Sequence, residues 1–170
     1  TWDMMRRLFV LVLLFLLMQT SCGIYSFSGA SIDPNIKTFS VDYFNNQASI
    51  VNPTLSQSLT EALKDKFLSR TSLTLIDSNG DMEFSGVITN YNTTPQAITG
   101  DQTAAMNRLT ISIRVTYRNA IDEKSNFTKT YSRYQDYDSS LSLNDVEGTL
   151  VDEIVTQLVD DIFNETAVNW

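Results

Sequence analysis

The chain of 170 residues contains no histidine and only one cysteine, and it has only six glycines and three prolines. Without histidine it lacks the commonest general base and the commonest metal ligand of proteins. Ser-His-Asp and Cys-His catalytic arrangements are therefore excluded. The few glycines form no glycine-rich loop that could hold a phosphate group. We expect no catalytic site, no metal and no cofactor; a hydrolase that uses only carboxylates, such as Asp122 or Asp160, is the alternative.

Positive charge is also scarce, because 12 basic residues against 20 acidic residues give a formal net charge of −8. Nucleic-acid-binding proteins normally carry the opposite sign, which excludes a nucleic acid as a partner. Any contact with an anionic lipid must therefore come from a local basic patch. The single cysteine cannot form an internal disulfide, so the folded part depends on its own hydrophobic core.

The beginning of the sequence has the pattern of an export signal. We expect translation to start at Met4 or Met5, which precede Arg6 and Arg7. Residues 8–18 then form a run without any polar side chain. This run is too short to cross a bilayer, which takes about 20 residues as a helix. A basic start, a short apolar segment and small residues before a cleavage point predict a signal peptide over residues 1–21.

Cys22 directly follows this segment, and its position predicts a thioether-linked diacylglycerol on the first residue of the mature protein. Each buried CH₂ group contributes about 0.8 kcal/mol, so the acyl chains would hold the protein on a membrane. Gln19 departs from the usual lipoprotein signal, which has an apolar residue at that position. Cleavage after Gly23, with a soluble product, is the alternative. Residues 22–34 are rich in serine and glycine and predict a tether, and residues 35–170 predict a single domain.

Alternation of apolar and polar residues predicts four strands, and apolar residues at helical spacing predict two helices. The strands are expected at 36–44, 82–91, 108–119 and 127–137, and the helices at 53–69 and 145–164. This order, β-α-β-β-β-α, predicts an α+β fold. Its architecture would be a two-layer sandwich, in which both helices pack on one face of a four-stranded sheet. The other sheet face would then meet water or a partner.

Several single residues refine these expectations. Asn52 is the predicted N-cap of the first helix, and Asn144 with Glu147 resembles a capping box at the start of the second. Gly86, in the middle of a predicted strand, indicates a bulge or a close approach of another group.

The best candidate for a binding site is a group of four basic residues on neighbouring strands. Arg114 and Arg118 share one face of their strand because they are four residues apart, and Lys129 and Arg133 share a face of the next strand. Together they could form a basic stripe for a phosphate-bearing lipid or an acidic partner. Two alternatives stay open. In the first, the arginines only keep a sheet face soluble. In the second, Lys129 and Arg133, which have the same parity as Phe127, face the helices instead.

The segment 93–107 is a second candidate. It separates two predicted strands, is mildly apolar and is longer than most hairpin loops, and such loops are often functional or mobile. It could insert into a partner or a lipid, or it could simply lack order.

Several segments in order along the chain resemble the LptE family of the Bacteroidetes type. They are residues 22–32 (CGIYSFSGASI), 52–53 (NP), 59–63 (LTEAL), 107–111 (NRLTI), 161–164 (DIFN) and 169–170 (NW). The resemblance extends over nearly the whole mature chain. It implies a domain with two helices packed on a four-stranded sheet, in agreement with the pattern of the residues.

The resemblance also implies a function without catalysis. LptE is the lipoprotein subunit of the outer-membrane translocon for lipopolysaccharide, where it forms a plug in the lumen of the β-barrel protein LptD. It supports assembly of that barrel and is thought to contact lipopolysaccharide. The expected location is therefore the outer membrane, with the domain on the periplasmic side or within the barrel. The alternative is a free-standing envelope lipoprotein that binds a small ligand or another protein on its open sheet face.

Overall fold

The computed structural model describes Trp2 and residues 32–96 and 105–168. Apart from Trp2, the predicted signal peptide lies outside the described residues, as do Cys22 and most of the predicted tether. The elements of the domain are β1 (Thr38–Val41), β2 (Asn45–Asn46), α2 (Leu55–Arg70), β3 (Thr74–Leu75), β4 (Met82–Gln96), β5 (Met106–Asn119), the short 3-10 helix η2 (Glu123–Ser125), β6 (Phe127–Asp138) and α3 (Leu143–Ala167). Neither α2 nor α3 is both long and apolar enough to cross a membrane.

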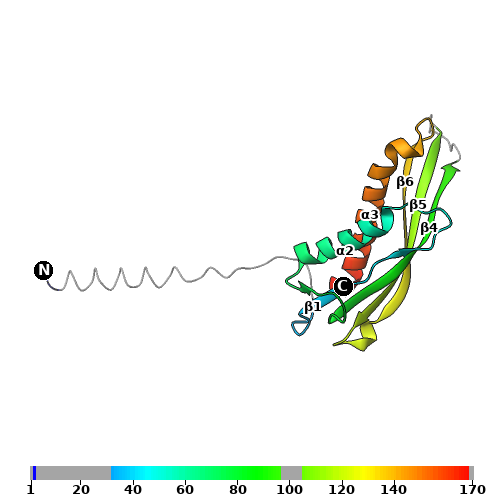
Figure 1. Ribbon diagram of the computed structural model, residues 1–170. Helices are drawn as coiled ribbons and strands as arrows, with labels where there is room; N and C mark the ends of the chain where they lie inside the picture. The colour runs from blue at the N-terminus through cyan, green and yellow to red at the C-terminus, as the bar shows by residue number, and fades with distance from the viewer. Residues whose placement is uncertain (1, 3–31, 97–104, 169–170) are drawn as a thin grey trace.

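The strands form one sheet in the order β3-β1-β4-β5-β6, and β2 also pairs with β4. β4, β5 and β6 are a long antiparallel meander, whereas β1, β2 and β3 join it by parallel pairing. Both helices lie on the same face of this sheet (Figure 1). The predicted α+β sandwich is confirmed, with two short strands, β2 and β3, in addition to the four that were expected.

Strict alternation in β5 separates the two faces of the sheet. Its odd-numbered apolar residues are buried beneath the helices; they are Leu109, Ile111, Ile113, Val115 and Tyr117. The even-numbered residues of β5 are polar, except for Met106 at its start, and they point to the opposite face. Because successive side chains of a strand point to opposite faces, burial of the odd-numbered residues beneath the helices places the even-numbered residues on the other face.

The helices meet the sheet through a cluster of aromatic rings around Phe67 of α2. Its ring centroid lies 5.4 Å from that of Phe39 in β1, 4.8 Å from that of Phe84 in β4 and 5.1 Å from that of Phe163 in α3. Phe67 is fully buried. One side chain therefore joins both helices to two strands.

Both predicted helix starts differ from the structure. α2 begins at Leu55 after Thr54 as its N-cap, but the Asn52 side chain still accepts hydrogen bonds from the Thr54 and Leu55 amides, at 2.9 and 3.0 Å. The predicted capping box in the second helix is wrong. α3 begins at Leu143, earlier than expected, and the Glu147 carboxylate accepts hydrogen bonds from Asn52 and Tyr91 instead.

The strand predictions need two corrections. Asn45 and Asn46, at which the sequence pattern ends the first strand, pair with Val87 and Ile88 as β2 after a short interruption. The loop predicted over 93–107 is too long at both ends, because β4 continues to Gln96 and β5 starts at Met106. Residues 97–104 lie outside the described part of the chain. Polar residues at the end of β4 interrupt the alternation there, so the sequence pattern underestimates the strand length. Pairing between β4 and β5 nevertheless extends both strands.

Gly86 supports a testable prediction about the fold. A Cβ atom at this position would overlap the Arg114 carbonyl oxygen and lie 2.6 Å from Cε1 of Phe44. Gly86→Ala should therefore lower the free energy of unfolding by about 1–3 kcal/mol, measured by urea denaturation. Gly148→Ala is the matched control, since its Cβ would meet no atom within 4 Å. Within α3 it should raise stability by about 0.8 kcal/mol. Equal effects of the two substitutions would contradict this packing.

Candidate ligand-binding face of the sheet

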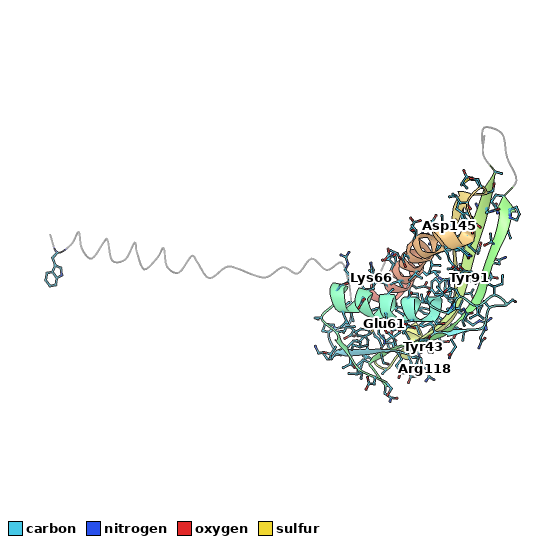
Figure 2. The ribbon with its side chains drawn as sticks, turned by 45° about the horizontal axis from the view of Figure 1, so that its top comes forward. Tyr43, Glu61, Lys66, Tyr91, Arg118 and Asp145 are labelled. Atoms are coloured by element: carbon cyan, nitrogen blue, oxygen red, sulfur yellow. The ribbon has the colours of Figure 1, made fainter. Side chains whose placement is uncertain are left out.

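The face of the sheet turned away from the helices is polar, and no helix or strand of the described residues covers it; we call it the open face. On β5 and β6 it carries the even-numbered side chains, most of them serine, threonine or charged residues. Hydroxyl pairs bridge the two strands, from Ser112 to Ser132 at 2.9 Å and from Thr116 to Thr128 at 3.0 Å. In Figure 2, Arg118 lies on the side of the sheet away from α2. A polar surface of this kind suits a polar ligand better than an apolar one.

Arg114 and Arg118 are exposed on this open face, with Thr116 between them. Four residues along a strand separate their Cα atoms by about 13 Å. Arg114 lies opposite Val87 and Thr130, and Arg118 lies opposite Glu83. Neither arginine forms an ion pair with a residue in the described part of the chain. Their guanidinium groups can therefore donate bidentate hydrogen bonds to a phosphate or a carboxylate.

A third arginine on the open face is already neutralised. Arg108 binds Asp136 through two hydrogen bonds of 2.7 and 2.8 Å, and its guanidinium carbon lies 3.7 Å from the ring centroid of Tyr134. The hydrogen bonds from Arg108 hold the pKa of Asp136 below its usual value. Because its charge is paired, Arg108 does not add to the anion-binding capacity of Arg114 and Arg118.

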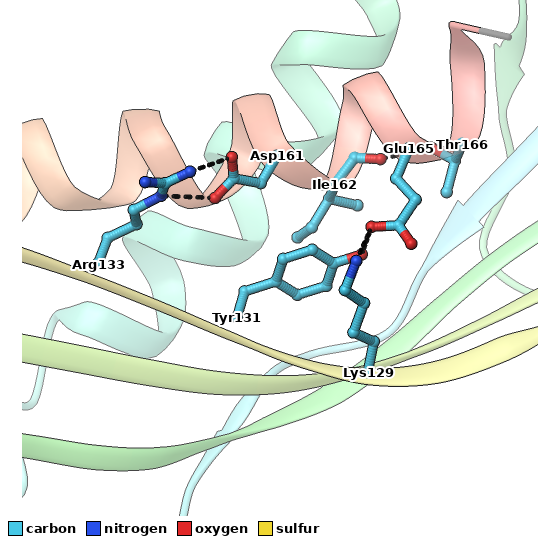
Figure 3. A network of polar contacts seen from close by, with 7 residues as sticks. All are labelled: Lys129, Tyr131, Arg133, Asp161, Ile162, Glu165 and Thr166. Atoms are coloured by element: carbon cyan, nitrogen blue, oxygen red, sulfur yellow. Dashed lines mark hydrogen bonds and ion pairs between the residues drawn. The ribbon is translucent and has the colours of Figure 1, made fainter. Parts of the chain in front are cut away.

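Lys129 and Arg133 point to the helix side, where two carboxylates of α3 bind them (Figure 3). The Lys129 Nζ lies 2.6 Å from Glu165, and Arg133 donates to Asp161 at 2.6 and 2.7 Å. These two ion pairs join β6 to α3, and each is partly exposed. Partly exposed ion pairs contribute at most about 1 kcal/mol each.

Tyr131 is buried between the two ion pairs and donates a hydrogen bond of 2.8 Å to Glu165. Burial, followed by this carboxylate, raises the pKa of the Tyr131 hydroxyl far above its usual value. The tyrosine thus stays neutral and serves as a hydrogen-bond donor. A depression of about 580 Å³ lies beside it, lined by residues 129–133 of β6 and by Asp161, Asn164 and Glu165 of α3.

The predicted stripe of four basic residues is therefore divided between two faces. Arg114 and Arg118 lie together on the open face, whereas Lys129 and Arg133 lie toward α3. The second of the two alternatives is therefore correct: Lys129 and Arg133 face the helices. In the register of β5 and β6, Val115 faces Lys129 and Ile111 faces Arg133, so these two cations share the side of the sheet that is buried by the helices.

The carboxylates considered for catalysis have structural partners. Asp160 of α3 forms an ion pair with Lys66 of α2, and Asp122 accepts a hydrogen bond from the Lys124 amide in its own turn. Among the described residues, no group of three or more histidine, cysteine or acidic side chains is arranged to hold a metal ion.

One polar network was not predicted from the sequence. The Glu147 carboxylate in α3 accepts hydrogen bonds from Asn52, before α2, and from the Tyr91 hydroxyl of β4. Burial raises the pKa of Tyr91, and the hydrogen bond to Glu147 raises it further. The network links the starts of both helices to the sheet. Its members lie 56 and 95 residues apart in the sequence, so no local pattern could have revealed it.

Comparisons with solved structures show the same fold elsewhere. Rare lipoprotein B from Shewanella oneidensis superimposes with a TM-score of 0.52 at 13% identity, over 75% of this chain and 92% of that chain. A hypothetical protein from Chlamydia trachomatis gives a TM-score of 0.54 at 11% identity, over 79% of this chain and 99% of that chain. At such identities the likeness concerns the fold alone. No curated protein matched the sequence.

Comparison with protein-family models identifies the family of this chain. The model described as LptE, lipopolysaccharide-assembly, matches residues 36–166, which include every strand and nearly all of α3. The matched region is most of the chain and coincides with the folded domain. The family is one of non-enzymatic outer-membrane lipoproteins. The chain therefore belongs to the LptE family of lipopolysaccharide-assembly proteins.

Proposed function

We propose that this protein is the plug subunit of an outer-membrane lipopolysaccharide translocon. In this role it occupies the lumen of an LptD-type β-barrel and supports assembly of the barrel. The match to the LptE family over residues 36–166 is the observation that carries the proposal. The fold supports this role, since helices cover one sheet face and no described element covers the other, which can meet a partner or ligand.

The ligand of the open face, in this proposal, is the anionic head group of lipopolysaccharide. Its phosphate groups would accept hydrogen bonds from Arg114 and Arg118, which are exposed on the open face and have no ion pair in the described part of the chain. The chain carries a net charge of −8, so these two side chains give the face a local attraction that the whole protein lacks.

Membrane attachment through a diacylglycerol on Cys22 completes the proposed arrangement. The cysteine directly follows the apolar segment 8–18 and a few small residues, which is the position of the modified residue in lipoproteins. The lipid would hold the domain at the inner surface of the outer membrane, next to a barrel. Residues 22–34 would serve as the tether between the lipid and the domain.

The barrel partner can be tested by affinity purification of the tagged full-length protein from detergent-solubilised outer membranes. We expect one large β-barrel protein to co-purify in an equimolar amount. A tagged lipoprotein of unrelated fold from the same membranes is the control and should not retain the barrel. If the acylated protein elutes alone, the plug is excluded, and a free-standing lipoprotein that binds its ligand on the open face becomes the better explanation.

A further inference from the structure

The two edges of the sheet differ in how they are protected from other strands. On one side the outermost strands, β2 and β3, have two residues each, and the part of β4 beyond them contains Pro95. Short strands and proline are the usual means by which a sheet edge resists further pairing. On the other side, β6 is an edge strand of 12 residues without proline. Among the described residues, β6 is therefore the edge that is open to another strand.

The register of β6 shows which of its backbone groups are free. The Ser139 amide donates to the Ala105 carbonyl at 3.0 Å, directly beyond the pair of Asp138 and Met106. In an antiparallel ladder, hydrogen-bonded and non-hydrogen-bonded pairs alternate. The odd-numbered residues of β6 therefore bond to β5, and the even-numbered ones point their amides and carbonyls outward. They include Thr128, Thr130 and Ser132, whose amides have no partner among the described residues.

The depression beside β6 provides room at these outward groups. Five consecutive residues of β6, 129–133, form one wall, and three residues of α3 form the other. A lining of consecutive strand residues means that the backbone edge itself borders the depression. A groove between an edge strand and a helix is the arrangement in which extended peptides add to a sheet.

The basic side chains of this region do not cover the backbone edge of β6. Lys129 and Arg133 are drawn toward α3 by Glu165 and Asp161, and so they leave the outward backbone groups uncovered. Their two positive charges are balanced by these two carboxylates. Net charge at the groove therefore does not select the ligand. The groups that remain available are free backbone amides and carbonyls, and another extended backbone can pair with them.

We propose that the groove between β6 and α3 binds an extended segment of the protein with which this chain is assembled, and that this segment adds to the sheet as a further strand beside β6. The inference deepens the proposed function and rests on it for the source of the segment. It assigns the protein partner to the edge of β6 and leaves the open face, with Arg114 and Arg118, to lipopolysaccharide. The two ligands would then occupy separate surfaces of one sheet.

Hydrogen exchange of the full-length protein tests this directly. The chain is labelled in its native outer membranes and, separately, after purification without partners, and exchange is resolved by mass spectrometry. We expect the amides of Thr128, Thr130 and Ser132 to exchange at least about tenfold more slowly in the membrane. Thr93 is the control, because its amide points outward from the edge of β4 and should exchange equally in both samples. Equal exchange at β6 in both samples would overturn the proposal.

A pair of substitutions distinguishes backbone pairing from side-chain contact. Ser132→Pro removes one outward amide, whereas Ser132→Ala removes only the hydroxyl. Proline should weaken retention of the partner about tenfold, and alanine should leave it unchanged. Co-purification of a barrel that proline does not weaken, without slowed exchange at β6, would refute strand addition while the plug function stands. Slowed exchange without any co-purified barrel would support strand addition and refute the plug.

Discussion

Phe67→Ala is expected to lower the free energy of unfolding by about 3–5 kcal/mol, the largest effect that we predict for a single substitution. The ring is fully buried and touches aromatic rings of β1, β4 and α3. Its removal leaves a cavity at the point where both helices meet the sheet. Such a loss approaches the whole stability of many domains of this size.

Urea denaturation of the mature chain, followed by circular dichroism, measures this loss. Leu68→Ala is the matched control, since the next residue of the same helix is 48% exposed. We expect the control to change stability by less than about 0.5 kcal/mol. A Phe67→Ala variant as stable as the control would mean that α2 does not pack on the sheet as described.

The largest functional effect is expected from the double substitution Arg114→Gln and Arg118→Gln. It should weaken binding of lipopolysaccharide by on the order of a hundredfold or more, because each charged hydrogen-bond donor contributes about 1.5–3 kcal/mol. The fold should be unaffected, since both side chains are exposed and have no ion pair in the described part of the chain. Equilibrium binding of purified lipopolysaccharide to the immobilised protein measures the affinity.

The matched control is the double substitution Lys129→Gln and Arg133→Gln. It removes the same charge from the neighbouring strand, but on the side of the sheet that faces α3. We expect its affinity for lipopolysaccharide to stay within about threefold of the original, since only long-range electrostatics change. If the two double variants weaken binding equally, the ligand does not recognise the open face.

The two surfaces also differ in their expected response to salt. The proposed binding to Arg114 and Arg118 would be electrostatic at an exposed site, where ions screen charges over about 8–10 Å at physiological ionic strength. The proposed strand addition at β6 would depend on backbone hydrogen bonds, which salt screens less. The separation of ligand and partner on one sheet would let the protein hold its partner while a lipopolysaccharide molecule binds and leaves.

Local sequence patterns determined most of the architecture. The alternation in residues 108–119 is strict because β5 lies in the middle of the sheet with one face buried and one in water. The spacing of Leu59, Leu63 and Phe67 likewise reflects one buried face of α2. The absence of histidine by itself excluded the commonest catalytic sites. Strand and helix patterns depend on neighbours within a few residues, which is what a sequence records directly.

Tertiary structure alone decided the features that depend on distant partners. The two-residue strands β2 and β3 are too short to show alternation, and they exist only because β4 and β1 lie beside them. Glu147 fitted a local capping box but binds Asn52 and Tyr91, because folding brings the starts of both helices together.

The division of the four basic residues shows the same limit. Sequence parity placed Arg114 with Arg118 and Lys129 with Arg133, but only the register of β5 against β6 and the carboxylates of α3 separated the two pairs. Side-chain direction along one strand is a local property, fixed by the backbone alternation. Whether a charge is neutralised depends on side chains that are 28 and 36 residues away in the sequence, and only the packed helix brings them within hydrogen-bonding distance.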